Sequence, residues 1–193
     1  RFVQLVAGRT GQLLNRESLA RDVGVDPKTV EVWLSALEAS FVIVRLQPFH
    51  ANLGKRLIKT PKVYMMDTGL ACHLLRIEEP RQLVAHPLRG ALFETLIVVE
   101  LLKRRFNTGR GANLFFYRDA GGREIDLVLE YADGVYPIEI KAASTFDASF
   151  AGTLGLLASR SPRGGAVVLG GGASGSRGTT RIAPWTQLAA LAD

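Results

Sequence analysis

Three short β-strands in close succession, between residues 113 and 142, constrain the fold of this chain more than any other feature of its sequence. They are rich in β-branched and aromatic residues and are separated by turns that contain Gly and Asp. The three stretches read "NLFFYR" (113–118), "EIDLVLEY" (124–131) and "VYPIEIKA" (135–142). Three strands that follow one another this closely predict a sheet, and this region supplies much of it.

The flanking segments predict what surrounds that sheet. "LRGALFETLIVVELLKRRF" (88–106) has the pattern of a long amphipathic helix, and a further helix is expected around residues 147–159. "GGAVVLGG" (164–171) has the composition of a buried strand, whereas the glycine-rich "GGGASGSRGTT" (170–180) is expected to be a flexible surface loop before "RIAPWTQL" (181–188). This order of elements predicts an α/β fold with a mixed sheet flanked by helices.

Two short helices are expected near the start of the chain. "NRESLARDVGV" (15–25) predicts a helix that ends near Gly24. "DPKTVEVWLSALEAS" (26–40) predicts the next one, with Asp26 as the N-cap and Pro27 in the first helical position. Two helices joined by a tight turn are typical of a helix-turn-helix.

The segment after these helices reads as a wing. "FVIVRL" (41–46) and "KVYMMD" (62–67) predict two strands around the loop 47–61. We therefore expect a winged helix-turn-helix domain over residues 1–66 and an α/β domain over residues 67–193.

Composition narrows the class of protein. The 193 residues carry a formal net charge of +6, with a pI of about 9.8, which makes an acidic partner such as nucleic acid plausible. The single cysteine, Cys72, excludes an intramolecular disulfide and suits a reducing compartment. Glu94 and Glu100 interrupt the most apolar run, so we expect a cytoplasmic protein without a membrane segment. Because the chain begins at Arg1, we treat it as part of a longer protein.

Three carboxylates and one lysine form a candidate site. Alternate residues of a strand share a face, so Glu139 and Lys141 point to the same side, and Asp126 can face them from a neighbouring strand. Glu94 lies among apolar residues of the predicted helix 88–106, where a carboxylate is costly unless its charge is compensated. A divalent cation would compensate it.

The chemistry explains why these residue types belong together. Mg²⁺ prefers hard oxygen ligands and is usually held by one or two carboxylates, with water and substrate phosphate in the other positions. We expect Asp126 and Glu139 to hold Mg²⁺ or Mn²⁺ with the Ile140 carbonyl, and Glu94 to act directly or through a water. Lys141 would orient the attacking water or stabilise charge on the phosphate. The four residues predict a phosphodiester hydrolase.

These residues resemble a known superfamily. "FE" at 93–94, Asp126 and "EIK" at 139–141 resemble the PD-(D/E)xK nucleases, whose fold is that of many restriction endonucleases. The wider stretches "HANLGKRLIKTPKVYMMDTGLACHLL", "HPLRGALFETLIVVELLK", "FYRDAGGREIDLVLE" and "YPIEIKAA" resemble the C-terminal DUF4143 region of bacterial and archaeal AAA+-type ATPases. This resemblance implies an ATPase domain before Arg1 and allows an oligomer formed through it. The sequence has no G-x-x-x-x-G-K-S/T, so this part of the protein is not expected to bind a nucleotide.

Basic residues outside that site are candidates for contacts with DNA. In the predicted wing and recognition helix, and around the strand of Asp126, the candidates are seven basic residues and one threonine: Lys28, Thr29, Lys55, Arg56, Lys59, Lys62, Arg118 and Arg123. Such side chains suit phosphate contacts, which position a protein on DNA without reading sequence. Two functions stay open at this point: a metal-dependent DNA endonuclease, and a catalytically inactive module that binds DNA or protein and targets or regulates the ATPase.

Overall fold

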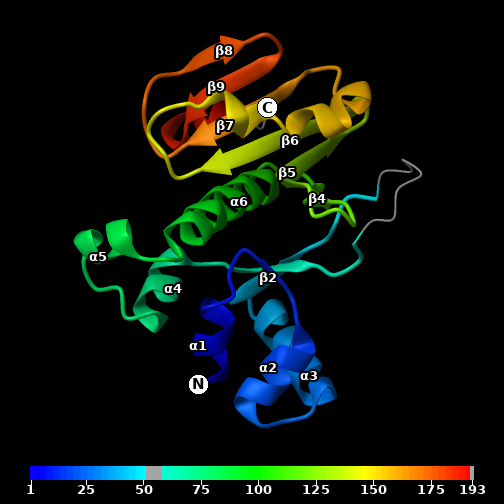
Figure 1. Cartoon of the computed structure of the whole chain (residues 1–193). Helices are drawn as coiled ribbons and strands as arrows, with labels where there is room; N and C mark the ends of the chain where they lie inside the picture. Colours follow the sequence, from blue (N-terminus) through cyan, green and yellow to red (C-terminus); the bar gives the residue numbers. More distant parts are fainter. Residues whose placement is uncertain (51–57, 192–193) are drawn as a thin grey trace. The chain divides into compact units, whose positions relative to one another are not determined.

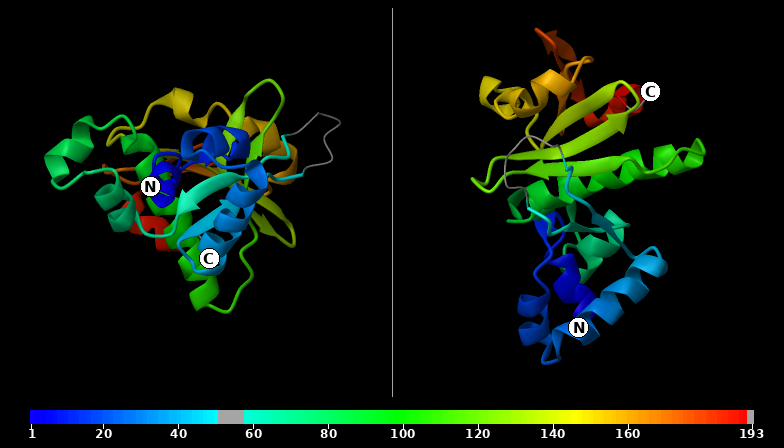
Figure 2. Two further views of the ribbon diagram at one scale, coloured as in Figure 1. Left: turned by 90° about the horizontal axis from the view of Figure 1, so that it is seen from below. Right: turned by 90° about the vertical axis from the view of Figure 1, so that its right-hand side faces the viewer.

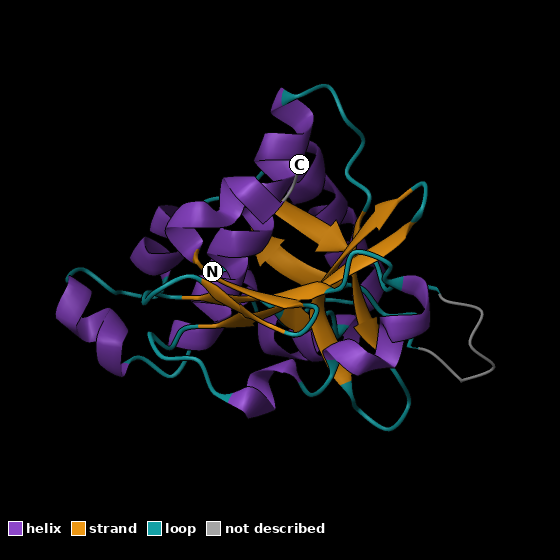
Figure 3. Cartoon of the chain, turned by 90° about the horizontal axis from the view of Figure 1, so that it is seen from above, coloured by secondary structure: helices purple, strands orange, loops and turns teal. Residues whose placement is uncertain are grey.

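The computed structural model describes residues 1–50 and 58–191, and its chain divides into two compact units (Figure 1). The first unit comprises residues 1–46 and 60–99, and the second comprises residues 47–59 and 100–193. The chain contains both helices and strands, coloured purple and orange in Figure 3. Within the described ranges, none of the helices has the length and apolar character needed to cross a membrane.

The first unit joins helices to a small antiparallel sheet. Its strands are ordered β1-β3-β2, and β3 pairs with both neighbours. The elements run α1 (Phe2–Ala7), β1 (Gln12–Leu13), α2 (Arg16–Val23), α3 (Pro27–Ala39), β2 (Ile43–Leu46), β3 (Lys62–Met65), α4 (Thr68–Leu74) and α5 (Pro80–Ala85), followed by the first part of α6 (Arg89–Asn107).

The two predicted helices of the helix-turn-helix segment are confirmed, and their ends are set by local chemistry. The Asn15 side chain accepts the Ser18 N–H at the start of α2, and Gly24 ends that helix with φ at +86°, a conformation that favours glycine. The Asp26 carboxylate accepts the N–H groups of Lys28 and Thr29 at the start of α3. Helices α2 and α3 lie side by side (Figure 2).

One apolar core holds the first unit together. It combines residues of the early helices with residues of β3, α4 and α6, among them Val30, Leu34, Met65, Ala71 and Leu92. Because β3, α4, α5 and the start of α6 share one unit with the early helices, the compact units divide the chain at positions other than the boundary at residue 66 suggested by the sequence. Separate folding of residues 1–66 and 67–193 stays a prediction.

The second unit contains a mixed sheet, as the sequence predicted, and this sheet has six strands. Its order is β4-β5-β6-β7-β9-β8, with β6, β7 and β9 parallel to one another and the remaining pairs antiparallel. The strands are β4 (Leu114–Arg118), β5 (Glu124–Tyr131), β6 (Gly134–Lys141), β7 (Gly165–Leu169), β8 (Gly175–Arg177) and β9 (Thr180–Pro184). The last part of α6 and three short 3₁₀ helices also belong to the unit: η1 (Ala148–Ala151), η2 (Leu154–Arg160) and η3 (Trp185–Leu191).

Two expectations for the second unit were wrong. The helix expected at 147–159 is two short 3₁₀ helices, η1 and η2, separated at Gly152 and Thr153, and glycine is a poor residue for a continuous α-helix. The glycine-rich segment 170–180 is not only a loop, because β8 and the first residue of β9 lie within it. Composition indicated a loop, but backbone pairing with β9 makes part of the segment a strand.

The described ends of the predicted wing loop belong to the second unit. Phe49 donates its N–H to the Phe116 carbonyl at 2.6 Å, and Phe116 donates to the Gln47 carbonyl at 3.2 Å. Residues 47–49 therefore run beside β4, at the edge of the six-stranded sheet. Lys55 and Arg56, which were predicted to contact DNA from this loop, lie outside the described residues.

Gly164, the residue directly before β7, allows a test of how tightly the second unit is packed. Gly164 has φ at +75°, and a Cβ there would lie 2.0 Å from the Thr179 carbonyl oxygen. Gly164→Ala should therefore lower the free energy of unfolding by about 2 kcal/mol or more. Gly155→Ala is the matched control, because nothing lies within 4 Å of its new methyl group, and its effect should stay within about 0.5 kcal/mol. Urea unfolding measures both, and equal losses would contradict this account.

Candidate active site

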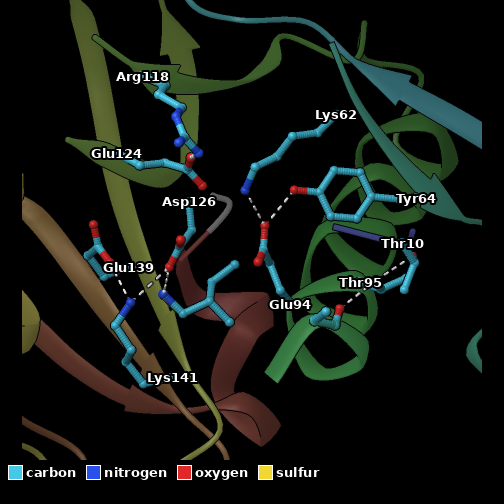
Figure 4. A network of polar contacts seen from close by, with 12 residues as sticks. Thr10, Lys62, Tyr64, Glu94, Thr95, Arg118, Glu124, Asp126, Glu139 and Lys141 are labelled. Carbon is cyan, nitrogen blue, oxygen red and sulfur yellow. Dashed lines mark hydrogen bonds and ion pairs between the residues drawn. The ribbon is translucent and has the colours of Figure 1, made fainter. Parts of the chain in front are cut away.

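Asp126 and Glu139 lie where two neighbouring strands of the second unit separate. Strands β5 and β6 pair antiparallel as far as Leu127 and Ile138. Beyond that pair the Asp126 carboxylate takes the place of a backbone acceptor, and its Oδ2 accepts the Ile140 N–H at 2.7 Å. The same carboxylate is thus fixed by the backbone of the strand that carries Glu139 (Figure 4).

Lys141 joins the two carboxylates. Its Nζ lies 2.7 Å from Glu139 Oε2 and 3.2 Å from Asp126 Oδ2. The predicted placement of Asp126 and Glu139 on adjacent strands, facing the same side as Lys141, is confirmed by this geometry. Catalysis and metal binding by these residues stay predictions.

Glu139 is unusually deep for a carboxylate. The residue is 4% exposed, and its Oε1 accepts a hydrogen bond from the Thr153 hydroxyl. Sequence reasoning missed Thr153, because the residue lies in a segment expected to be one helix, whereas it occupies the break between η1 and η2. The only signal for Thr153 in the sequence was a hydroxyl residue close to glycines, where a helix can break.

Burial and charge shift the ionisation of this group of side chains. Burial, assisted by the negative charge of Asp126, raises the pKa of Glu139 from 4.5 to about 7. Burial alone would lower the pKa of the Lys141 ammonium, but the charge of Asp126 and the hydrogen bond to Glu139 raise it above its ordinary value. One ammonium faces two carboxylates, so the site has an excess of negative charge that favours an additional proton or cation.

Glu94 belongs to the first unit, and its charge is compensated there by neighbours on β3. Its Oε1 accepts hydrogen bonds from Lys62 Nζ at 2.8 Å and from the Tyr64 hydroxyl at 2.6 Å. Lys62 is only 3% exposed, so its position favours an ion pair within the protein over the predicted contact with a phosphate. The sequence indicated a divalent cation as the compensating charge, because a lysine on a distant strand could not be placed beside Glu94.

Two buried threonines, Thr10 and Thr95, form a polar contact in the same unit as Glu94. The hydroxyls of Thr10 and Thr95 lie 2.8 Å apart, and both residues are fully buried (Figure 4). Thr95 follows Glu94 in α6 and is hydrogen bonded to the Ala91 carbonyl, so its hydroxyl is satisfied inside the helix.

The other residues predicted to contact DNA are distributed over both units. Arg118 forms an ion pair with Glu124 at 2.8 Å, and the half-exposed Arg123 pairs with Asp119 at 2.7 Å.

Lys28 and Thr29 begin α3, where the Thr29 hydroxyl donates to Asp26 Oδ2 at 2.6 Å. Lys59 lies in the part of the second unit that precedes β3. The structure therefore gives Arg118, Arg123 and Thr29 intramolecular partners, and their contacts with DNA stay predictions.

The donor set in the second unit suits a hard divalent cation. Two carboxylates are sufficient protein ligands for Mg²⁺, whose remaining positions are filled by water and substrate oxygen. Asp126 and Glu139 provide such a pair, and the position between them already holds the positive charge of Lys141. Over residues 1–50 and 58–191, no group of three or more His, Cys, Asp or Glu side chains is arranged to hold a metal ion.

The family of the chain follows from its comparison with known domains. Residues 89–188 match the model of a domain of unknown function (DUF4143), and this segment includes Glu94, Asp126, Glu139 and Lys141. The chain belongs to the DUF4143 family. Residues 1–81 match the model of a second domain of unknown function (DUF8612). No solved structure matches the chain.

Two mycobacterial proteins are similar to this DUF4143 chain. The uncharacterized proteins Rv2008c of Mycobacterium tuberculosis and Mb2031c of Mycobacterium bovis are each 34% identical to it over 141 residues. Each alignment covers 73% of this chain and 31% of the relative. The chain therefore spans about a third of the length of the curated relatives it matches.

The raised pKa of Glu139 predicts how the stability of the DUF4143 chain depends on pH. The stabilisation from a protonated Glu139 is fully present below pH 4.5 and is lost as the pH rises through about 7. At about 1.4 kcal/mol per pKa unit, the loss reaches about 3 kcal/mol. Glu139→Gln should remove this slope in urea unfolding measured from pH 4.5 to 8, whereas the exposed Glu130→Gln should keep it. Parallel profiles for wild type and Glu139→Gln would contradict the shift.

The hydrogen bond from Thr153 predicts a second effect. Thr153→Val leaves a buried carboxylate oxygen without its donor and should lower the free energy of unfolding at pH 8 by about 1 to 3 kcal/mol. Thr153→Ser keeps a hydroxyl and serves as the control, with at least half of the loss restored. If the loss is the same at pH 4.5 and pH 8, Thr153 contributes packing and not a bond to the ionised Glu139.

Proposed function

We propose that the second unit is a Mg²⁺-dependent DNA endonuclease domain of the PD-(D/E)xK type. The observation that supports this most is the convergence of Asp126 and Glu139, on adjacent strands, upon the ammonium of Lys141. A buried salt bridge of this kind is weak evidence of a stabilising role, since hydrophobic residues of the same size often serve stability as well. Strongly perturbed ionisable groups are, in contrast, common at functional sites.

Each residue has a role in this proposal. Asp126 and Glu139 hold the cation, which when bound supplies Lewis-acid stabilisation of the phosphate and a more acidic water. Asp126 is oriented by the Ile140 N–H, and Glu139 by the Thr153 hydroxyl. Lys141 orients the attacking water or stabilises negative charge on the phosphate. The proposal needs only two carboxylates, and both belong to the second unit; the predicted role of Glu94 as a metal ligand stays a prediction.

The finer description of the fold belongs to the same proposal. The order α1, β1, α2, α3, β2, β3 with an antiparallel three-stranded sheet supports a winged helix in the first unit. A mixed sheet whose central strand carries Glu139 and Lys141 supports a restriction-endonuclease-like fold in the second. Basic residues such as Lys28 and Lys59 would contact DNA phosphates.

The whole protein is proposed to be an AAA+-type ATPase that acts on DNA through this C-terminal part. The matched segment is 31% of each mycobacterial relative, which leaves room in those proteins for a further domain. The 193 residues contain no Walker motif, and nucleotide binding is proposed to belong to that other domain. Mg²⁺ or Mn²⁺ is the proposed cofactor of the chain itself.

The decisive experiment combines cleavage with metal binding. The chain is incubated with supercoiled, linear and branched DNA in Mn²⁺, and its thermal unfolding is followed with and without the metal. We expect metal-dependent nicking, reduced at least about 100-fold in Asp126→Asn and in Lys141→Ala. The metal should also raise the melting temperature of wild type and Lys141→Ala, but not of Asp126→Asn. Glu130→Gln, on the same strand as Asp126 but exposed, should behave as wild type.

A non-catalytic module is the second candidate function. The ammonium of Lys141 already pairs with both carboxylates, and a proton on Glu139, whose pKa is raised to about 7, would balance the remaining charge without a metal, as a site that only binds DNA or protein would require. Absence of nicking on every DNA, together with an unchanged melting temperature in Mn²⁺, would reject the nuclease and favour this module.

A further inference from the structure

The outer face of helix α3 in the first unit is apolar. Four exposed residues of the helix, at positions i, i+1, i+4 and i+7, share this face: Val32, Trp33, Ala36 and Ala39. Residues three and four apart are neighbours on a helix surface, so these side chains form one stripe, the α3 stripe. Val32 is 66% exposed and Trp33 is 37% exposed. A helix that faces only water carries polar residues on its outer side, so the α3 stripe is suited to burial against a partner.

The polar residues of α3 favour a protein over a nucleic acid as that partner. Among residues 27–39, Lys28 in the first turn is the only basic one. Glu31 and Glu38 are held by Arg45 of β2, with oxygen-to-nitrogen distances of 2.6 Å and 2.7 Å. Binding to DNA depends on several lysine or arginine contacts with phosphates, which this helix does not supply.

Phe41, in the turn that follows α3, is held in a conformation that favours glycine. Its φ is +55°, and its N–H donates to the Glu38 carbonyl at 3.0 Å. The next N–H, that of Val42, donates to the Leu37 carbonyl at 2.9 Å and completes a helix end in which glycine is the usual residue. The Phe41 side chain is 73% exposed, so packing within the chain does not offset this strain. Strained residues of this kind persist where function requires them.

The first helix of the chain begins beside the α3 stripe. The ring of Phe2, the first residue of α1, packs edge-on against Trp33, with 5.0 Å between the ring centroids. A domain joined to Arg1 is therefore tethered next to the stripe, which gives it a high effective concentration there. The matched segment is only 31% of each mycobacterial relative, so those proteins have enough further chain for such a domain.

We propose that the α3 stripe and Phe41 dock in an apolar groove of the ATPase domain proposed to precede Arg1. The stripe supplies the face of an amphipathic helix, and the Phe41 ring is an aromatic anchor beyond the end of that helix. The inference rests on the proposed function for the existence of that domain, and it adds the surface through which the first unit binds it.

Hydroxyl-radical footprinting, read by mass spectrometry, tests this docking in the full-length protein. Trp33 and Phe41 are exposed in the 193-residue chain, so both should be oxidised readily there. At the same radical dose, their oxidation in the full-length protein should be several-fold lower, because the docked domain covers them. Equal oxidation of both residues in the two proteins would overturn the inference.

Two valines provide a matched pair of variants. Val32 on the stripe and Val84 on α5 belong to the same unit and are 66% and 65% exposed. In the full-length protein, Val32→Lys puts a charge into the docked surface and should restore the oxidation of Trp33. Val84→Lys adds the same charge outside the stripe and should leave Trp33 protected. Equal release of Trp33 by both variants would contradict docking through α3.

A third variant separates docking from the stability of the chain. Phe41→Gly removes the ring together with the strain, so the urea midpoint of the 193-residue chain should stay unchanged or rise. In the full-length protein the same variant should shift the docking equilibrium roughly 10-fold toward the undocked form, as loss of an aromatic anchor does. A lower urea midpoint would mean that the ring stabilises the chain itself, against its role in docking.

Further outcomes separate the inference from other partners and from the proposed function. Protection of Trp33 that appears in the 193-residue chain as its concentration rises indicates a second copy and overturns the inference, and protection that requires added DNA does the same. If the full-length protein hydrolyses ATP while Trp33 stays unprotected, the ATPase stands and the docking is wrong. If Trp33 is protected while no ATP is hydrolysed, docking to the preceding domain stands and the ATPase is wrong.

Discussion

Strand β6 carries the constraint on which the second unit depends. One of its edges pairs antiparallel with β5, the other pairs parallel with β7, and its side chains include a carboxylate that is almost completely buried. Glu139 directly follows the last residue of β6 that pairs with β5 and is itself paired with Val167 of β7, so its backbone has little freedom to move and the carboxylate cannot reach water to avoid the cost of burial. Its surroundings must supply the compensation, and they do so through Lys141 and Thr153.

The separation of β5 and β6 at this point brings the second carboxylate, Asp126, to the same lysine. Asp126 accepts the Ile140 N–H and thereby replaces a backbone acceptor at the place where the two strands separate. The separation brings two carboxylates to one ammonium and leaves an excess of negative charge. A site with that charge balance is suited to a cation, and a cation between two carboxylates is suited to a phosphate.

The first unit also contains a carboxylate with little exposure to water, but the side chains around it provide a different charge balance. Glu94 is also a poorly exposed carboxylate, but Lys62 and Tyr64 meet it from a neighbouring strand and provide one ammonium and one hydroxyl. The Lys62 ammonium thus compensates the Glu94 carboxylate within the first unit. The contrast between the two clusters explains why the second unit, with two carboxylates for one lysine, is the better candidate for metal chemistry.

The sequence by itself determined the features that arise from neighbours along the chain. Asn15, Gly24 and Asp26 set the ends of α2 and α3 through hydrogen bonds and backbone conformations that span only a few residues. Alternation along β6 also placed Glu139 and Lys141 on one face, because side chains of a strand alternate whatever the strand packs against, whereas the register between β5 and β6 brought Asp126 to the same face.

Only the tertiary structure decided what depends on distant partners. Part of the glycine-rich segment 170–180 became β8 because β9 offered backbone groups to pair with, and Lys62 became the partner of Glu94 because β3 lies beside α6. Thr153 reached Glu139 through the break between η1 and η2. In each case the stabilising energy comes from a contact between two segments that are well separated along the chain. Local sequence propensity does not encode such contacts.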